Sequence, residues 1–252
     1  MKTVIIKSLF ISIATIILTI ILRNLFQTES YLTDVGGLGA FVTVFGTLYG
    51  IMAAFVVFEV WGQYNKTSTL IDNEALGIER LFRLTLYFRD EKLTKQMRES
   101  IENYANIVIS DNFQKLGSGA RNKEASSSFR KIAGVIRDIE FNDDHDSIIY
   151  DHIVNHYGEL SETRTERIAH CLMRLPYLLR FFLYMTSAVA VIVFVIMPFA
   201  NSLYHLFAVG AITLVIAMVV QLVEDLDNPF KGNWTIDASP FKRALDHIKK
   251  DY

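Results

Sequence analysis

Four long apolar segments stand out along the chain, two near its N-terminus and two in its C-terminal third. They cover about residues 3–22, 37–61, 181–200 and 203–223. Each is close to the roughly 20 residues that a helix needs to cross the hydrocarbon core of a bilayer. The pattern therefore predicts four transmembrane helices in two pairs. Only Asn201 and Ser202 separate the last two segments, which predicts a tight helical hairpin.

The first apolar segment admits two interpretations. A positively charged start followed by an apolar stretch is typical of a signal peptide as well as of an uncleaved span. The stretch is long for a signal peptide, and no cleavage site with small residues follows it before Arg23. Lys7 lies near one end, where its long stem can reach the headgroups. We expect an uncleaved span.

The region between the two pairs of spans is helical in its periodicity. Apolar residues recur at steps of three and four through most of it, and no strand alternation of any length appears. No helix breaker separates it from the second span, which we expect to continue into it as one helix. The sequence predicts an all-α integral membrane protein with four transmembrane helices and a cytoplasmic helical insert between the second and third. The expected divisions are 1–61 for the first two spans, 62–178 for the insert, 179–225 for the hairpin and 226–252 for a cytoplasmic tail.

Two local features of the sequence concern the end of the insert. Thr163 and Glu166 have the spacing of a capping box, which predicts that the last cytoplasmic helix begins there. Pro176 follows shortly before the third span, and a proline inside a helix kinks it. We expect the third span to continue this cytoplasmic helix through a bend at Pro176.

The basic residues predict the orientation of the spans. The loop from Arg23 to Asp34, both included, holds one basic residue and two acids, and the hairpin loop holds no basic residue. Lysine and arginine gather instead at the N-terminus, on both sides of the insert and in the tail. Because basic loops stay in the cytoplasm, both termini and residues 62–178 are predicted to be cytoplasmic. The expected location is the cell membrane, with a bacterial inner membrane favoured.

Composition excludes several classes of function. Hydrophobic residues make up 51% of the 252 residues, and the formal net charge is -2, so no global basic field favours nucleic acid. A single cysteine, Cys171, cannot form an internal disulfide. No catalytic signature is present, so we expect neither an enzyme nor a cofactor. His152 and His156 have a spacing that can bind a metal, but the same spacing is common on a solvated helix face. We expect no metal.

The second span has two different faces. One narrow arc at helical spacing holds a mainly aromatic and apolar set: Phe41, Phe45, Leu48, Met52, Phe55 and Glu59. Gly46 and Gly50 lie opposite and form a small-xxx-small pair that lets helices pack closely. Either one face meets helices and the other meets lipid, or the aromatic face lines a hydrophobic constriction in an oligomer. A carboxylate such as that of Glu59 is costly inside a bilayer and is often functional there. Glu59 also lies one turn before Gln63, a position that fits the level of the lipid headgroups.

The end of the fourth span is the most distinctive stretch. Glu224, Asp225 and Asp227 end the helix, where carboxylates oppose the macrodipole and need compensation. Arginines of the insert or a bound cation would supply it, and a salt-bridged turn is favoured over calcium because the acids lack a fixed calcium-loop spacing. Pro229, Phe230 and Gly232 then predict a turn.

The stretches 226–232 and 237–241 resemble the C-terminal signature of the bestrophin-like domain family, a family of unknown function. Glu74-Ala75, the stretch 81–84 and Leu175-Pro176 also agree with it, and the layout covers nearly the whole chain. Asn228 departs from the basic residue that is more usual in the family.

The resemblance implies an oligomeric ion channel, because bestrophins are pentameric anion channels with an aromatic and aliphatic pore neck on the second span. Expected partners are then the lipid bilayer, inorganic ions and further copies of the chain, as a pentamer by analogy. Lys231 and the absence of a long acidic run argue against calcium gating, and a pore-facing Glu59 would disfavour anions, so charge selectivity stays open. The alternative is a non-conducting membrane scaffold or signalling protein whose cytoplasmic helices bind a partner.

Overall fold

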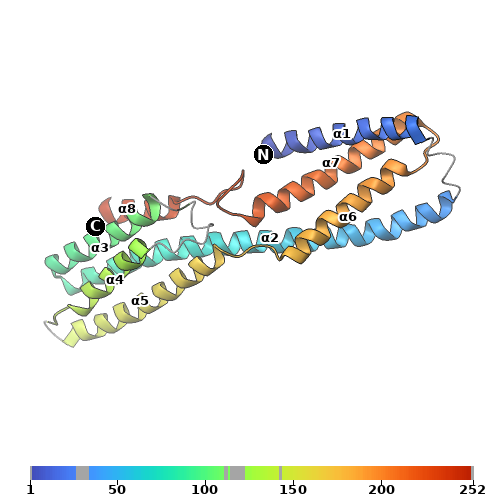
Figure 1. Ribbon diagram of the computed structural model, residues 1–252. Coiled ribbons are helices and arrows are strands. Elements are labelled where there is room, and N and C mark those ends of the chain that lie inside the picture. The colour runs from blue at the N-terminus through green and yellow to red at the C-terminus, as the bar shows by residue number, and fades with distance from the viewer. Residues whose placement is uncertain (1, 27–33, 111–112, 114–122, 142–143, 251–252) are drawn as a thin grey trace. The chain divides into compact units, whose positions relative to one another are not determined.

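The computed structural model describes residues 2–26, 34–110, 113, 123–141 and 144–250, and in this part of the chain all regular structure is helical (Figure 1). In chain order the helices are α1 (Lys2–Phe26), α2 (Val35–Thr85), the 3-10 turn η2 (Leu86–Phe88), α3 (Glu91–Ser110), α4 (Lys123–Arg137), α5 (Asp144–His170), α6 (Tyr177–Ile196), α7 (Ser202–Asp227) and α8 (Ser239–Lys250). By length and composition α1, α2, α6 and α7 can each cross a membrane. The predicted all-α class with four such helices is confirmed.

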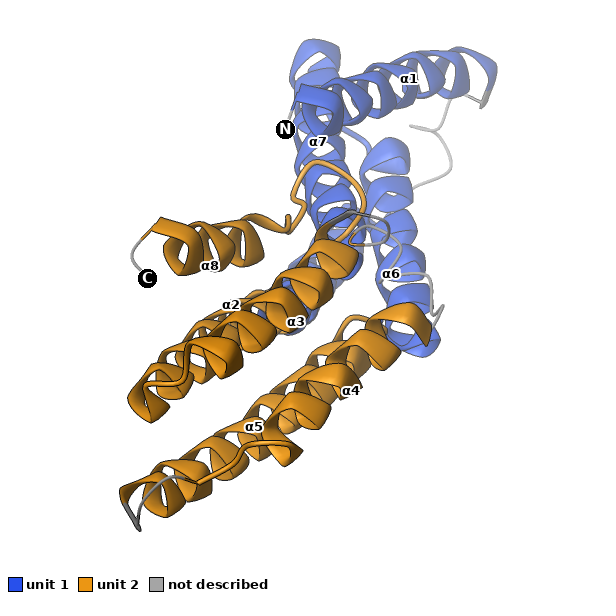
Figure 2. Ribbon diagram, turned by 90° about the vertical axis from the view of Figure 1, so that its left-hand side faces the viewer, with its two compact units in different colours: residues 1–62, 174–228 blue, residues 63–173, 229–252 orange. Residues whose placement is uncertain are grey.

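The chain divides into two compact units, which Figure 2 shows in different colours. Unit 1 comprises residues 1–62 and 174–228, and unit 2 comprises residues 63–173 and 229–252. Helix α2 contributes its first part to unit 1 and the remainder to unit 2. Its 51 residues form one helix, as the absence of a breaker predicts.

In unit 1, α1 packs against α7 (Figure 1), and small and polar side chains meet between the two helices. Ser12 Oγ donates to the carbonyl of Gly210 at 2.8 Å, and Gln221 Nε2 donates to Ser8 Oγ at 2.6 Å. A methyl group on Gly210 would lie 2.9 Å from Ile16 Cδ1, so glycine permits this close approach. Inter-helix hydrogen bonds of this kind satisfy polar groups that lipid cannot satisfy.

Unit 2 has a conventional apolar core. The second part of α2 and helices α3, α4, α5 and α8 each contribute buried side chains to it. The largest fully buried ones include Phe82, Met97, Tyr104, Phe230 and Phe241. Phe241 lies on α8, whose apolar face packs against α3, so the C-terminal tail is part of this core rather than a free extension.

Two local predictions about the end of the insert are wrong. Thr163 is not an N-cap: it lies inside α5, where its hydroxyl donates to the carbonyl of Glu159 at 2.9 Å, so no helix begins there. No bent helix passes through Pro176 either. Helix α5 ends at His170, and Pro176 occupies the N-cap position of α6 with φ -52° and ψ 136°. The residue before a proline avoids the helical region of φ and ψ. The chain is therefore extended there, and the next helix, α6, begins at Tyr177.

Replacing Gly77 by alanine is expected to destabilise unit 2, although alanine is the better helix former. The added methyl group would lie 2.7 Å from Cδ1 of Leu160, which is buried and has little room to move. Overpacking of this kind costs about 1–3 kcal/mol. The matched control is Gly158→Ala on α5, where the methyl group meets open space and helix propensity adds about 1 kcal/mol. In detergent, the melting temperature of G77A should be lower than that of the native protein, and the melting temperature of G158A should be equal or higher. The reverse order would contradict the prediction.

Candidate functional site

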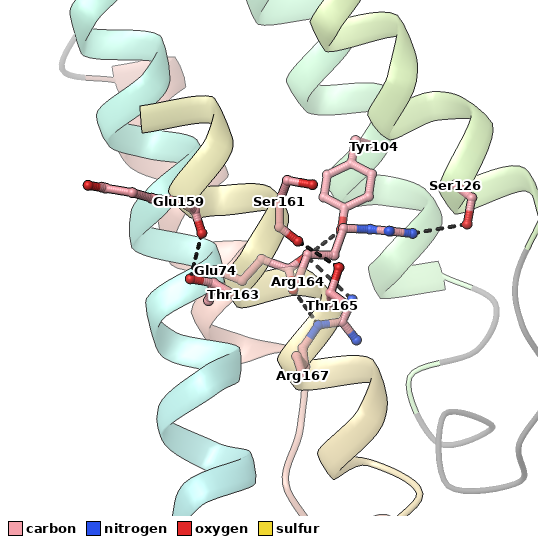
Figure 3. A network of polar contacts seen from close by, with 9 residues as sticks. All are labelled: Glu74, Tyr104, Ser126, Glu159, Ser161, Thr163, Arg164, Thr165 and Arg167. Atoms are coloured by element: carbon pink, nitrogen blue, oxygen red, sulfur yellow. Dashed lines mark hydrogen bonds and ion pairs between the residues drawn. The ribbon is translucent and has the colours of Figure 1, made fainter. Parts of the chain in front are cut away.

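A buried carboxylate lies at the centre of unit 2. Glu74 of α2 is fully buried, and Arg167 of α5 forms an ion pair with it through Nε and Nη2 (Figure 3). The hydroxyl of Tyr104, on α3, donates to the same carboxylate. A buried carboxylate without partners would cost several kcal/mol, on the order of 3–5. The Glu74 network therefore requires α2, α3 and α5 to meet in this one arrangement.

A second arginine extends this network to α4. Arg164 Nε donates to the Tyr104 hydroxyl at 3.1 Å, and Arg164 Nη2 donates to Ser126 Oγ at 3.1 Å (Figure 3). Its guanidinium also lies over the ring of Phe129, 5.0 Å from the centroid. Such cation–π contact adds about 0.5–2 kcal/mol. Helices α2, α3, α4 and α5 thus contact one connected polar cluster.

Burial and charge shift the titration of two groups in this cluster. Burial raises the pKa of Tyr104 above its ordinary value of 10.0, and the nearby negative charge of Glu74 raises it further. Burial acts to lower the pKa of Arg167, but the attraction and hydrogen bonds of Glu74 outweigh it and the pKa is raised. Tyr104 therefore stays neutral and Arg167 stays charged throughout the pH range of cells.

A second ionic cluster lies in unit 1, where α7 ends. Asp227 is buried and accepts hydrogen bonds from the backbone N–H of Leu175 and from Arg180 Nη2. Arg180 Nε also lies 3.4 Å from Glu224 Oε1, and Tyr184 OH donates to that carboxylate. The predicted salt-bridged turn is present, and Arg180 of α6 supplies a cation to both Glu224 and Asp227. Asp225 is half-buried beside this cluster in sequence.

The signature residues after Asp227 anchor the tail to the core of unit 2. Phe230 is buried and meets Phe113 edge to face, with ring centroids 5.8 Å apart. The N–H of Ile236 donates to the carbonyl of Pro229 at 2.8 Å, which closes the turn. Gly232 has φ 106°, a conformation that other residues rarely adopt. The turn expected from Pro229, Phe230 and Gly232 is therefore formed.

Most of the predicted pore-facing set of α2 is exposed within the single chain. Phe41, Leu48, Phe55 and Glu59 are exposed, whereas Phe45 and Met52 are half-buried. The side of α2 that faces the rest of unit 1 carries Ala53, Val56 and Val60, all buried, and Tyr49, whose hydroxyl lies 3.1 Å from Ser187 Oγ on α6.

Gly46 and Gly50 have no close neighbour within the described chain. A methyl group built on either meets nothing within 4 Å. The close helix approach expected from this pair is therefore not made among the described residues of one chain, and a partner from outside the chain stays a prediction. Among the described residues, no group of three or more His, Cys, Asp or Glu side chains is placed to hold a metal ion.

The family model of the bestrophin-like domain matches residues 9–241. The chain belongs to the bestrophin-like family. Among solved structures it resembles a bacterial bestrophin homolog from Klebsiella pneumoniae, solved by Zn-SAD phasing, with TM-score 0.74, 12% identity and coverage of 98% of this chain and 97% of that one. A mutant of the Klebsiella homolog gives TM-score 0.74 at 13% identity, covering 98% and 99%. No curated protein matches.

Part of the polar chemistry of this bestrophin-like chain was not evident from its sequence. Glu74 was noted for its resemblance to a family motif, but its partners Tyr104 and Arg167 are 30 and 93 residues away along the chain. The available signal was a carboxylate among the apolar residues Leu70, Ile71, Ala75 and Ile78 of one helix, all of which are buried. That pattern indicates a buried acid but does not name its partners.

Replacing Arg167 by methionine is expected to destabilise unit 2 by about 3–5 kcal/mol, because it leaves Glu74 buried without its cation. The matched control is Lys66→Met. It removes an ion pair with Glu166 between the same two helices, but those side chains are 51% and 50% exposed, and such pairs contribute about 0–1 kcal/mol. Chemical unfolding of both variants in detergent checks the difference. Equal losses would show that the buried pair contributes no more than the exposed one.

Stability is expected to fall as the pH rises above the ordinary tyrosine pKa of 10.0. The folded state holds the Tyr104 proton more tightly than the unfolded state, so its contribution is complete below that pKa and decreases above it, by up to about 1.4 kcal/mol per pH unit. Tyr104→Phe should make the fall above pH 10 shallower, whereas replacement of the exposed Tyr87 by phenylalanine should leave it unchanged. An unaltered profile in Y104F would contradict this cause.

Proposed function

We propose that this protein forms a homo-oligomeric, anion-conducting channel in the cell membrane, with α2 lining the pore. The observation that carries the proposal is that, within unit 1, one side of α2 is exposed while the other side is buried. Leu48 and Phe55 are 62% and 70% exposed, whereas Val56 and Val60 on the packed side are at most 3% exposed. Membership of the bestrophin-like family and the fold of its solved bacterial homologues support an ion channel.

The predicted pore-facing set would form a narrow apolar constriction. Phe41 and Phe45 stack on one another with centroids 5.4 Å apart, and Leu48, Met52 and Phe55 continue the same arc of the helix. A ring of such side chains from several copies would exclude water and gate conduction by dewetting. One copy cannot enclose a pore with one face of one helix, so the proposal requires an oligomer, and a pentamer is expected by analogy.

Exposed apolar groups outside the membrane spans are consistent with further contacts between copies. Leu76 of α2 and Ile148 of α5 are 60% and 61% exposed in unit 2. Contact with neighbouring copies would remove such side chains from water. We place both termini and the insert in the cytoplasm, as the distribution of basic residues predicts. No enzymatic step is assigned to the chain.

The channel is tested by recording purified protein in planar bilayers. Phe55→Ala widens the proposed constriction and is expected to raise the current several-fold. The matched control is Phe58→Ala, because Phe58 is 75% exposed on the same helix but lies outside the pore-facing arc. Its current should equal that of the native protein. Equal effects of the two changes would place the pore elsewhere.

Two further readouts test the other parts of the proposal. The mass of the protein–detergent complex must correspond to an oligomer, and a monomer would overturn the pore. The reversal potential in a potassium chloride gradient reports charge selectivity, and it should lie on the side of the chloride equilibrium potential. Removing the charge with Glu59→Gln should move it further to that side if Glu59 faces the pore. Absence of current in any salt would favour a non-conducting scaffold instead.

A further inference from the structure

A cavity of about 400 Å³ lies in unit 2 where α2 gives way to α3. The turn η2 and the first two turns of α3 border this cavity, which is largely open to solvent, and its lining includes Leu86 and Thr94 as well as charged side chains. Three of the charged groups are cations, Arg89, Lys95 and Arg98, and two are acids, Asp90 and Glu91. The proposed pore does not involve any of these residues.

The acid Asp90 is already engaged by backbone groups. Its Oδ1 accepts hydrogen bonds from the N–H groups of Lys92 at 2.8 Å and Leu93 at 3.1 Å, which caps the start of α3. A carboxylate used as an N-cap has its charge stabilised by the helix. Asp90 is therefore used as a cap, and among the described residues it forms no ion pair with the three cations of the cavity.

Arg98 is positioned by an aromatic ring rather than by a carboxylate. Its guanidinium lies over Phe82, 5.3 Å from the ring centroid, and its Nε is buried with no hydrogen-bond partner. Within the described part of the chain, no ion pair is formed by Arg89, Lys95 or Arg98. A stacked guanidinium is held in place while its N–H fork remains available to an oxyanion.

The backbone also places a cation at this cavity. Arg89 has φ 56°, the left-handed conformation at the end of η2 that glycine usually fills, and its N–H donates to the carbonyl of Leu86. A non-glycine residue there costs on the order of 1 kcal/mol or more. An arginine in this position adds a second guanidinium to the lining.

We propose that this cavity binds a phosphate-bearing anion, with Arg98, Lys95 and Arg89 as its ligands. The cavity is far larger than a halide ion, and its lining holds three cations against the two acids Asp90 and Glu91, an excess of positive charge that favours an anion such as a phosphate or pyrophosphate group. The arginine fork suits two phosphate oxygens at once, and the lysine adds a point charge. An occupant would tie the end of α2 to the start of α3.

The test titrates the full-length protein in detergent with inorganic pyrophosphate by calorimetry at constant ionic strength. Saturable binding is expected, and Arg98→Gln should weaken it at least tenfold. Arg130→Gln is the matched control, because Arg130 is exposed on α4 and outside the cavity lining. Its affinity should equal that of the native protein.

Lys95→Gln and Arg89→Gln change exposed side chains and keep the test decisive if R98Q fails to fold. Both should weaken binding. No saturable binding up to millimolar pyrophosphate, or equal effects of the cavity variants and R130Q, would overturn the site. Mixed micelles with phosphatidic acid distinguish the source of the phosphate: competition with pyrophosphate that K95Q abolishes supports the site with a lipid headgroup as its ligand. If pyrophosphate binds and phosphatidic acid does not compete with it, the result supports a soluble ligand. None of these measurements needs a current, so they stand apart from the channel test.

Discussion

The arrangement of unit 2 depends on one charge that water cannot reach. A carboxylate in a low-dielectric interior is tolerated only with a cation and hydrogen-bond donors around it. Glu74 on α2 obtains these from α5 through Arg167 and from α3 through Tyr104. A shift of any of these helices by one residue would leave the charge unpaired. The apolar core supplies most of the burial, but the Glu74 network selects one register among those that the apolar faces would allow.

The spans of unit 1 obey the same constraint in another solvent. Lipid offers no hydrogen bonds, so polar groups among the helices must satisfy one another. Ser12 bonds to the backbone of α7, Gln221 bonds to Ser8, and Tyr49 approaches Ser187. Asp227 and Arg180 do the same with full charges where α6 begins and α7 ends. Neither unit relies on packing of apolar surface alone.

The sequence predicts those features that depend on local composition and periodicity. Long apolar runs predicted the four spans, the absence of a breaker predicted the continuous α2, and Pro229 with Gly232 predicted the turn. The prediction at Pro176 was wrong because a proline has two roles at a helix, interrupting it or starting it, and composition does not separate them. Thr163 was misassigned because a capping spacing also occurs by chance inside a helix. The partners of Glu74 were out of reach, since only the folded chain brings residues 74, 104 and 167 together.

Helix α2 carries three features that otherwise appear separate. Its first part bears the proposed pore-facing set, its second part bears Glu74, and its end at Thr85 adjoins the cavity lined by Arg89, Lys95 and Arg98. A helix without proline or a bulge resists sharp bending, because a kink requires a break in its ladder of hydrogen bonds. The buried ion pair with Arg167 would oppose rotation of α2 about its axis, since rotation would move Glu74 away from its cation. An anion bound at the far end would act on the same helix, and so a channel built on α2 would have its regulatory input on the helix that also forms its gate.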